Sequence, residues 1–151
     1  MTSTNNTFSV TKAEDSTGFL LWQVTNLWQR EIKKALEPHG LTHSQFVLMA
    51  SIHWLILHNK EVTQVILSAH TKIDVMTTST VLRTLQQKGF LHRQEHATDT
   101  RAKTVALTEE GITIIKNAIV IVEAFDTSFF SSLGSELKGF NQKLMALLEM
   151  K

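Results

Sequence analysis

One predicted helix carries hydroxyl, amide and guanidinium groups on a single face and no carboxylate there. At 100° per residue, residues 75–88 place together the side chains of Thr77, Thr80, Arg83, Thr84 and Gln87, with Met76 at the edge. Ordinary solvated helix faces usually mix glutamates with lysines. Threonine, glutamine and arginine can hydrogen-bond to base edges in the DNA major groove, which is roughly 12 Å wide. The face therefore favours contact with a duplex, although threonine also occurs on inert surfaces.

The stretch FLHRQEHATDTRAKTVALTEEG, residues 90–111, holds another group of charged side chains. It alternates polar and apolar residues over 91–95, breaks at a polar loop over 96–101, and alternates again over 102–107. This pattern predicts a β-hairpin, with Leu91 and Val105 turned toward the core. Basic residues in such a loop can lie against the DNA backbone or in the minor groove.

The charges of the whole chain are concentrated around the same region. The net charge is only +1, but residues 72–103 hold six Lys or Arg against three Asp or Glu. Residues 1–71 hold five of each kind, and residues 104–151 hold four basic against six acidic side chains. A positive centre would hold a polyanion. On charge alone, random scatter is an equally good explanation.

These groups must be positioned by helices, and the apolar periodicity predicts six of them. They cover residues 17–36, 42–58, 63–70, 75–88, 109–131 and 135–150. The second is apolar on nearly every side, which is typical of a helix in the middle of a core. Thr63, Asp74 and Thr108 are expected to cap three helices, and Gly89 to end the fourth. The inward face of that fourth helix is expected to hold Val75, Thr78, Val81, Leu82 and Leu85.

The predicted order is α-α-α-α-β-β-α-α, a mainly α chain with one small β-hairpin. A short helix, a helix with an acid-free polar face and a basic-tipped hairpin together describe a winged helix-turn-helix. Residues 1–15 are predicted to form a flexible polar tail before a single domain over 16–151. They lack the basic start and apolar core of a signal peptide.

Two longer segments resemble the MarR family of bacterial transcription regulators. DTRAKTVALTEEG matches the family's wing pattern D-x-R-x-x-x-V-x-L-T-x-x-G, and TQVILSAHTKIDVMTTSTVLRTLQQKGFLHR matches the two helices before it. The resemblance covers residues 17–149. It implies that 75–88 is the recognition helix, with Thr77, Thr80 and Arg83 in the major groove beside Thr84. It also implies a wing that contacts DNA through His96, Arg101 and Lys103, with Asp99 orienting Arg101.

The resemblance further implies how the chain is organised and regulated. Residues 16–40 and 109–151 would form the dimerisation helices of a homodimer, and 42–107 the DNA-binding part. The implied function is that of a cytoplasmic repressor, bound to a near-palindromic operator and released by a small aromatic or phenolic effector. The family often has proline and arginine where this chain has Ala97 and Thr100. Those departures imply weaker backbone binding by the wing.

Several other classes of function lack the residues they need. The chain has no cysteine, which excludes disulfides, thiolate zinc sites and thiol redox sensing. The pairs His39/His43 and His92/His96 are spaced by four but are not aligned on one helix, so no metal is expected. No Gly-rich phosphate loop, activated nucleophile, paired carboxylates or membrane span is found. We therefore expect no enzyme, cofactor or membrane partner, and a winged-helix module that docks protein is the remaining alternative.

The aromatic and apolar stripes leave two explanations open. Trp22, Trp28 and Trp54 suit an effector cavity, but aromatics at helical spacing more often belong to a core or interface. His53 is expected to be a hydrogen-bonded core residue. The stripe of the 109–131 helix is either intrachain core or a dimer interface, and the surplus of apolar residues on the first and last helices favours the dimer. Its members are Ile112, Ile115, Ile119, Val122, Phe125 and Phe129.

Overall fold

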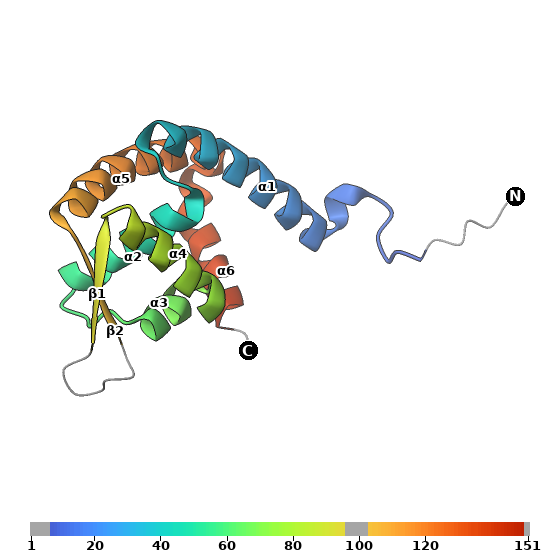
Figure 1. Cartoon of the computed structure of the whole chain (residues 1–151). Helices are drawn as coiled ribbons and strands as arrows, with labels where there is room; N and C mark the ends of the chain where they lie inside the picture. Colours follow the sequence, from blue (N-terminus) through green and yellow to red (C-terminus); the bar gives the residue numbers. More distant parts are fainter. Residues whose placement is uncertain (1–6, 96–102, 150–151) are drawn as a thin grey trace, which may run out of the picture.

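The computed structural model describes residues 7–95 and 103–149, and in them it has the predicted order of elements (Figure 1). The six helices are α1 (Thr17–Leu36), α2 (His43–Leu57), α3 (Gln64–Thr71), α4 (Val75–Gln87), α5 (Glu109–Phe129) and α6 (Leu137–Leu148). The hairpin consists of β1 (Leu91–Glu95) and β2 (Lys103–Leu107). Short 3-10 segments lie at Ala13–Asp15, Glu37–His39 and Ser131–Glu136. The first of these falls within the predicted tail.

The helix ends follow local capping chemistry. The side-chain oxygens of Thr63, Asp74 and Thr108 each accept a hydrogen bond from a backbone N–H in the first turn of α3, α4 and α5. Thr42 and Gln45 form a reciprocal capping box at the start of α2. Gly89 has φ +81°, as the residue after α4 requires. The three predicted caps and the predicted terminating glycine are confirmed.

Helix α2 lies in the middle of the core, as its all-round apolar sequence predicts. Its residues Leu48, Met49 and Ile52 are fully buried. The elements around them also contribute fully buried side chains, which are Ile32, Leu36, Leu67, Leu82, Leu85, Ile115 and Ala118. One apolar cluster therefore joins α1, α3, α4 and α5 around α2 and gives the polar face of α4 a rigid base.

The hairpin is fixed to the core along one face. Leu91 pairs with Leu107 and Arg93 pairs with Val105 in an antiparallel register. Leu91, Val105 and Leu107 are buried, as predicted for the first two. The Val105 N–H also donates to the carbonyl oxygen of Val62 at 2.9 Å, which ties β2 to the segment before α3. The hairpin is therefore held against the core, close to α4.

The stripe of α5 packs within its own chain. Ile115 and Val122 are buried, and Ile112, Ile119 and Phe125 are packed against the core. The expectation that favoured a dimer interface for this stripe is therefore wrong for its central residues, because α1 and α2 of the same chain already cover them. The helix also ends at residue 129, two residues before the predicted end.

Three further details differ from the predictions, and another narrows an open one. Val75 is 48% exposed, although it was expected on the inward face of α4. Trp22 and Trp54 are 66% and 56% exposed, so neither is a core residue, and the interface and the effector cavity stay open as explanations. His53 is only half-buried. The last helix starts at Leu137, because Gly134 has φ +53° within the preceding 3-10 segment.

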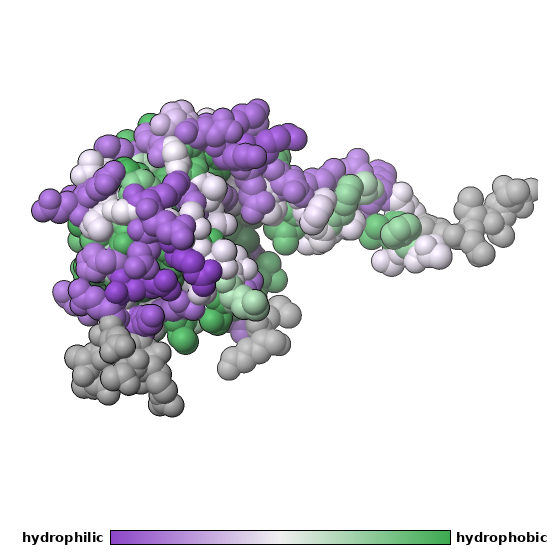
Figure 2. Space-filling view, viewed as in Figure 1, coloured by the Kyte–Doolittle hydropathy of each residue, from purple (hydrophilic) through white to green (hydrophobic). Residues whose placement is uncertain are grey.

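The first half of α1 projects beyond the rest of the chain (Figure 1). Its apolar side chains have no core to enter, and Figure 2 shows green patches on the lower side of this arm. Six of them are between 40% and 66% exposed, namely Phe19, Leu20, Leu21, Trp22, Val24 and Leu27. None of the helices in the described ranges is long and apolar enough to cross a membrane. The exposed arm is therefore an apolar surface that packing within the chain does not explain.

Candidate nucleic-acid interface

The outward face of α4 has the composition predicted for it. Thr77, Thr80 and Arg83 are exposed, and Thr84 is half-buried. The Thr80 hydroxyl donates to the carbonyl oxygen of Met76 at 3.1 Å, and the Thr84 hydroxyl donates to that of Thr80 at 3.2 Å. Because the hydroxyl protons are held by the helix backbone, oxygen lone pairs and methyl groups remain for an incoming partner. Such a face can accept hydrogen bonds from bases and contact thymine methyl groups.

Asp74 organises the first turn of α4 and orients Thr77. Its Oδ1 accepts the Thr77 backbone N–H at 2.8 Å, and its Oδ2 accepts the Thr77 hydroxyl at 2.8 Å. These bonds, the backbone one first, hold the pKa of the Asp74 carboxyl below its ordinary value of 3.8. An ionised carboxylate is also favoured at the positive end of a helix. Both donors of Thr77 are therefore engaged in the free chain.

A cationic hollow of about 520 Å³ opens between α3, α4 and the hairpin. Three basic side chains contribute to its wall, and none of its described lining residues is acidic. The lining residues are Thr63, Gln64, Val65, Ser79, Arg83, Arg93 and Lys103. Three converging cations without a carboxylate form a suitable surface for the phosphates of a nucleic acid.

Arg93 is the member of this hollow that the sequence interpretation missed. It pairs with Val105 across the hairpin, so both side chains lie on the face that carries Leu91 and Leu107. Its Nε–H donates to Oε1 of Gln86 on α4 at 2.9 Å. The alternation of β1 was the signal that could have placed Arg93 beside α4, because it lies two residues after Leu91.

The structure brings five of the predicted residues together and leaves three undescribed. Thr77, Thr80, Arg83 and Thr84 lie on α4, and Lys103 faces Arg83 across the hollow. His96, Asp99 and Arg101 lie outside the described residues.

A second polar cluster joins helices α1 and α5 to the start of α2. The Nε1–H of Trp28 on α1 donates to Oδ1 of Asp126 on α5 at 2.9 Å. The His43 ring, at the start of α2, meets the Trp28 ring edge-on with 5.0 Å between centroids. Burial lowers the pKa of His43 below its ordinary value of 6.5, and the nearby Asp126 charge opposes that shift. No group of three or more metal-ligating side chains exists within 7–95 and 103–149.

Comparisons with known proteins agree with this geometry. Residues 37–124 match the family model described as ArnR1-like, winged-helix domain. The uncharacterized HTH-type transcriptional regulator YdcH of Bacillus subtilis is 44% identical over 117 residues, which cover 78% of this chain and 80% of that protein. The chain belongs to the ArnR1-like winged-helix family of HTH-type transcription regulators, and its fold is that of the MarR family.

Other similar proteins carry names that bear on the function of this chain. The HTH-type transcriptional repressor Rv2887 of Mycobacterium tuberculosis is 28% identical over 77% of this chain and 81% of that protein. A MarR mutant from E. coli, complexed with operator DNA, has a TM-score of 0.76 at 22% identity, over 88% of this chain and 93% of that chain. CouR from Rhodococcus jostii, bound to p-coumaroyl-CoA, has a TM-score of 0.80 at 22% identity, and the match covers 93% of this chain and 96% of that chain. The family consists of regulators and not of enzymes.

Proposed function

We propose that this MarR-family chain is a dimeric repressor that binds a near-palindromic operator. The observation that carries the proposal is the acid-free face of α4 beside the hollow formed by Arg83, Arg93 and Lys103. That arrangement suits a helix in the major groove, with the hairpin along the adjacent backbone. The repressor name of the Mycobacterium tuberculosis relative and the operator complex of the structural neighbour support it.

The proposed interface divides base reading from phosphate binding. Arg83 projects from the exposed face of α4 and has a guanidinium fork that fits guanine. Arg93 and Lys103 lie on the hairpin and are assigned to the backbone. The wing-tip roles of His96, Asp99 and Arg101 are part of the proposal and rest on the sequence pattern alone.

The dimer is proposed from the apolar surfaces of α1 and α6. A groove of about 350 Å³ runs between these helices and is lined mostly by Leu21, Val24, Trp28, Leu137, Phe140 and Leu144. A short helical stretch without packing is marginal in water, so the projecting half of α1 requires a covering partner. A second copy suits it, because a two-fold dimer would match a near-palindromic site.

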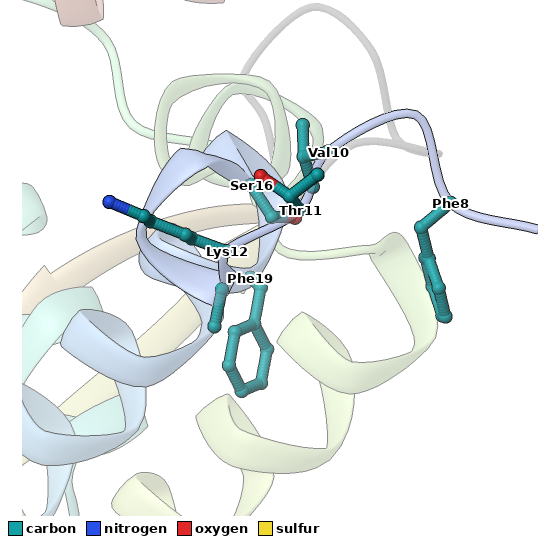
Figure 3. Close-up of a pocket in the computed structure, with 7 residues that line it drawn as sticks. Phe8, Val10, Thr11, Lys12, Ser16 and Phe19 are labelled. Carbon is teal, nitrogen blue, oxygen red and sulfur yellow. The ribbon is translucent and has the colours of Figure 1, made fainter. Parts of the chain in front are cut away.

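The segment before α1 extends the same apolar surface. Seven residues near the N-terminal end of α1 line a hollow of about 450 Å³. In Figure 3 the rings of Phe8 and Phe19 extend from the chain toward the same side, whereas the Lys12 ammonium points away from them. This arrangement gives the segment an apolar side that a second copy can cover, and we include it in the proposed interface.

An aromatic effector is proposed to bind where the long helices meet the reading head. CouR is similar in fold and was crystallised with p-coumaroyl-CoA. In this chain the place where α1 and α5 meet the start of α2 holds the cluster of Trp28, His43 and Asp126. A ligand that separated these side chains would change the orientation of the DNA-binding part, residues 42–107, relative to the proposed dimer helices α1 and α5. Operator affinity would then fall. Because a bacterial operator lies in the cytoplasm, the proposed function also places the chain there.

The test is a selection of genomic DNA fragments by the purified protein, followed by gel shifts at two salt concentrations. We expect one near-palindromic sequence to be enriched, and its affinity to fall steeply as salt rises. Absence of any retardation on random duplex at low salt would contradict the proposal and would favour a protein-docking module. The enriched operator would identify the neighbouring gene, whose chemistry selects the compounds to try as effectors.

A further inference from the structure

The residues that follow α4 are held from the side of α5. The Thr108 hydroxyl donates to the carbonyl oxygen of Gly89 at 2.7 Å, and the Thr108 N–H donates to that of Phe90 at 3.0 Å. Gly111 packs so tightly against Phe90 that a Cβ there would clash with its carbonyl oxygen. The first turn of α5 therefore clamps the C-terminal end of the recognition helix.

Lys88 holds the same end of α4 through a separate set of contacts. Its Nζ donates to the carbonyl oxygen of Gly40 at 2.8 Å and to Oε1 of Gln45 at 3.3 Å. Gly40 ends the turn after α1 with φ +68°, and Gln45 is a buried residue in the first turn of α2. One ammonium group thus connects α4 to the corner between α1 and α2.

The acceptors of Lys88 belong to a fixed structure. Oε1 of Gln45 also accepts the backbone N–H of Thr42 at 3.0 Å, and the Gln45 N–H donates to the Thr42 hydroxyl at 3.2 Å. The ammonium also lies 5.7 Å from the centroid of the Phe90 ring. Charge-assisted bonds to preorganised acceptors are stronger than bonds between neutral groups. The contact therefore restrains the end of α4 more than an ordinary surface lysine would.

We propose that Lys88 is a positioning residue that sets the orientation of the recognition helix relative to the dimer helix α1. The inference rests on the proposed function, because it matters only if two copies of α4 read one operator. Through Lys88 and the corner 37–42, a shift of α1 moves the C-terminal end of α4. Together with the Thr108 clamp from α5, this fixes the separation of the two recognition helices.

A direct role of Lys88 in phosphate binding is the rival explanation. The hollow that carries Arg83, Arg93 and Lys103 does not include Lys88. The Nζ group is engaged with Gly40 and Gln45, on the side of the α1–α2 corner. The two roles differ in salt dependence, because losing one phosphate contact reduces the salt slope by about 1, whereas losing a positioning contact leaves it unchanged.

The experiment compares Lys88→Met with Lys88→Arg in the full-length protein. Methionine keeps much of the side-chain length without a donor, whereas arginine keeps the charge and the donors. Lys116→Met is the matched control, since Lys116 is exposed on α5 and makes no hydrogen bond within the described residues. Affinity is measured by fluorescence anisotropy on the selected operator, and on versions with one base pair added or removed between half-sites.

We expect Lys88→Met to lose about tenfold in affinity for the natural spacing, the size of one charge-assisted hydrogen bond. Its preference over the altered spacings should fall, its salt slope should stay that of the wild type, and Lys88→Arg should restore both affinity and preference. An unchanged spacing preference in Lys88→Met would overturn the proposal. So would a salt slope reduced by about 1, which would make Lys88 a phosphate ligand.

A second arm needs no DNA and separates this inference from the proposed function. Lys88→Met, Gln45→Met and the double variant are unfolded with urea, which gives a double-mutant cycle. A destabilised Lys88→Met protein and non-additive effects in the cycle are expected, the second of which measures the bond to Gln45 alone. A Lys88→Met protein as stable as the wild type would show that neither the bond to Gly40 nor the bond to Gln45 contributes. If the wild type bound no duplex, the proposed function would fail, and the positioning role with it, whatever the unfolding showed. If it bound DNA but Lys88→Met were as stable as the wild type, the role of Lys88 alone would be wrong.

Discussion

Gly111 shows how the absence of a side chain allows α5 to approach the link between α4 and the hairpin. The position that its Cβ would take is filled by the Phe90 carbonyl, which belongs to the link between α4 and the hairpin. This contact gives a physical reason for the last residue of the wing motif, which ends in T-x-x-G. The glycine is required by close approach, because the Thr108 cap draws the first turn of α5 against Phe90.

Gly111→Ala is expected to destabilise the protein by about 1–3 kcal/mol, the usual cost of overpacking a tight contact. The free energy of unfolding in urea measures it. Gly139→Ala is the matched control, because Gly139 lies within α6 with open space around it. There the better helix propensity of alanine should give about 1 kcal/mol of stabilisation or less. Equal effects of the two variants would show that the close approach is absent.

Arg83 carries the prediction for sequence specificity. Arg83→Ala should weaken operator binding by about 1–3 kcal/mol and relax the preference at one or two base positions. Arg93→Ala should instead weaken binding to every duplex alike and reduce the salt slope, because Arg93 is assigned to the backbone. Selections repeated with each variant measure both effects. Unaltered base preference in Arg83→Ala would remove Arg83 from the reading face.

His43 carries the prediction for pH dependence. Its pKa is lowered in the fold by burial, so below about pH 6.5 the unfolded chain binds a proton more readily than the folded chain does. The free energy of unfolding should therefore fall as pH drops through 6.5 toward the lower pKa of the folded state. Urea unfolding at pH 7.5 and 5.5 should show a smaller fall for His43→Gln. His92→Gln, at an exposed position on β1, should keep the fall of the wild type.

At the scale of single elements, the starts of α3, α4 and α5 and the end of α4 were predictable because their causes are local. Thr63, Asp74 and Thr108 cap helices through bonds that span three residues, and such bonds are visible in the sequence. The hairpin was equally predictable, because strand alternation and a polar loop lie within one stretch. The exposed residues of α4 were predicted correctly for the same reason, because helical periodicity decides which side chains share a face.

Features that depend on distant partners were not predictable. The exposure of Val75 depends on where the core ends. Arg93 was missed because its role comes from Gln86 on another element. Lys88 was missed because its acceptors lie more than 40 residues earlier in the chain. The interpretation of the α5 stripe failed because apolar periodicity does not say whether its partner belongs to the same chain.

At the scale of the whole molecule, the proposed dimer predicts that one charge in the α1–α6 groove separates the subunits. Leu144→Glu places a carboxylate among Leu21, Val24 and Phe140, where the second copy would bury it. We expect a monomer by light scattering and lost binding to the full operator. Leu57→Glu is the control, because Leu57 is 63% exposed at the end of α2 and lies outside the groove. A dimeric Leu144→Glu protein would contradict the proposed interface.

The projecting half of α1 has a consequence for gene dosage. In the proposed dimer this segment gains its packing only when two subunits meet, so the folding of this arm is coupled to pairing. At low abundance the concentration of dimer then rises with the square of the concentration of free chain, and so does operator occupancy. A modest fall in synthesis would release the operator more than proportionally. The same arm that covers the partner would thereby give the regulator a threshold in its own copy number.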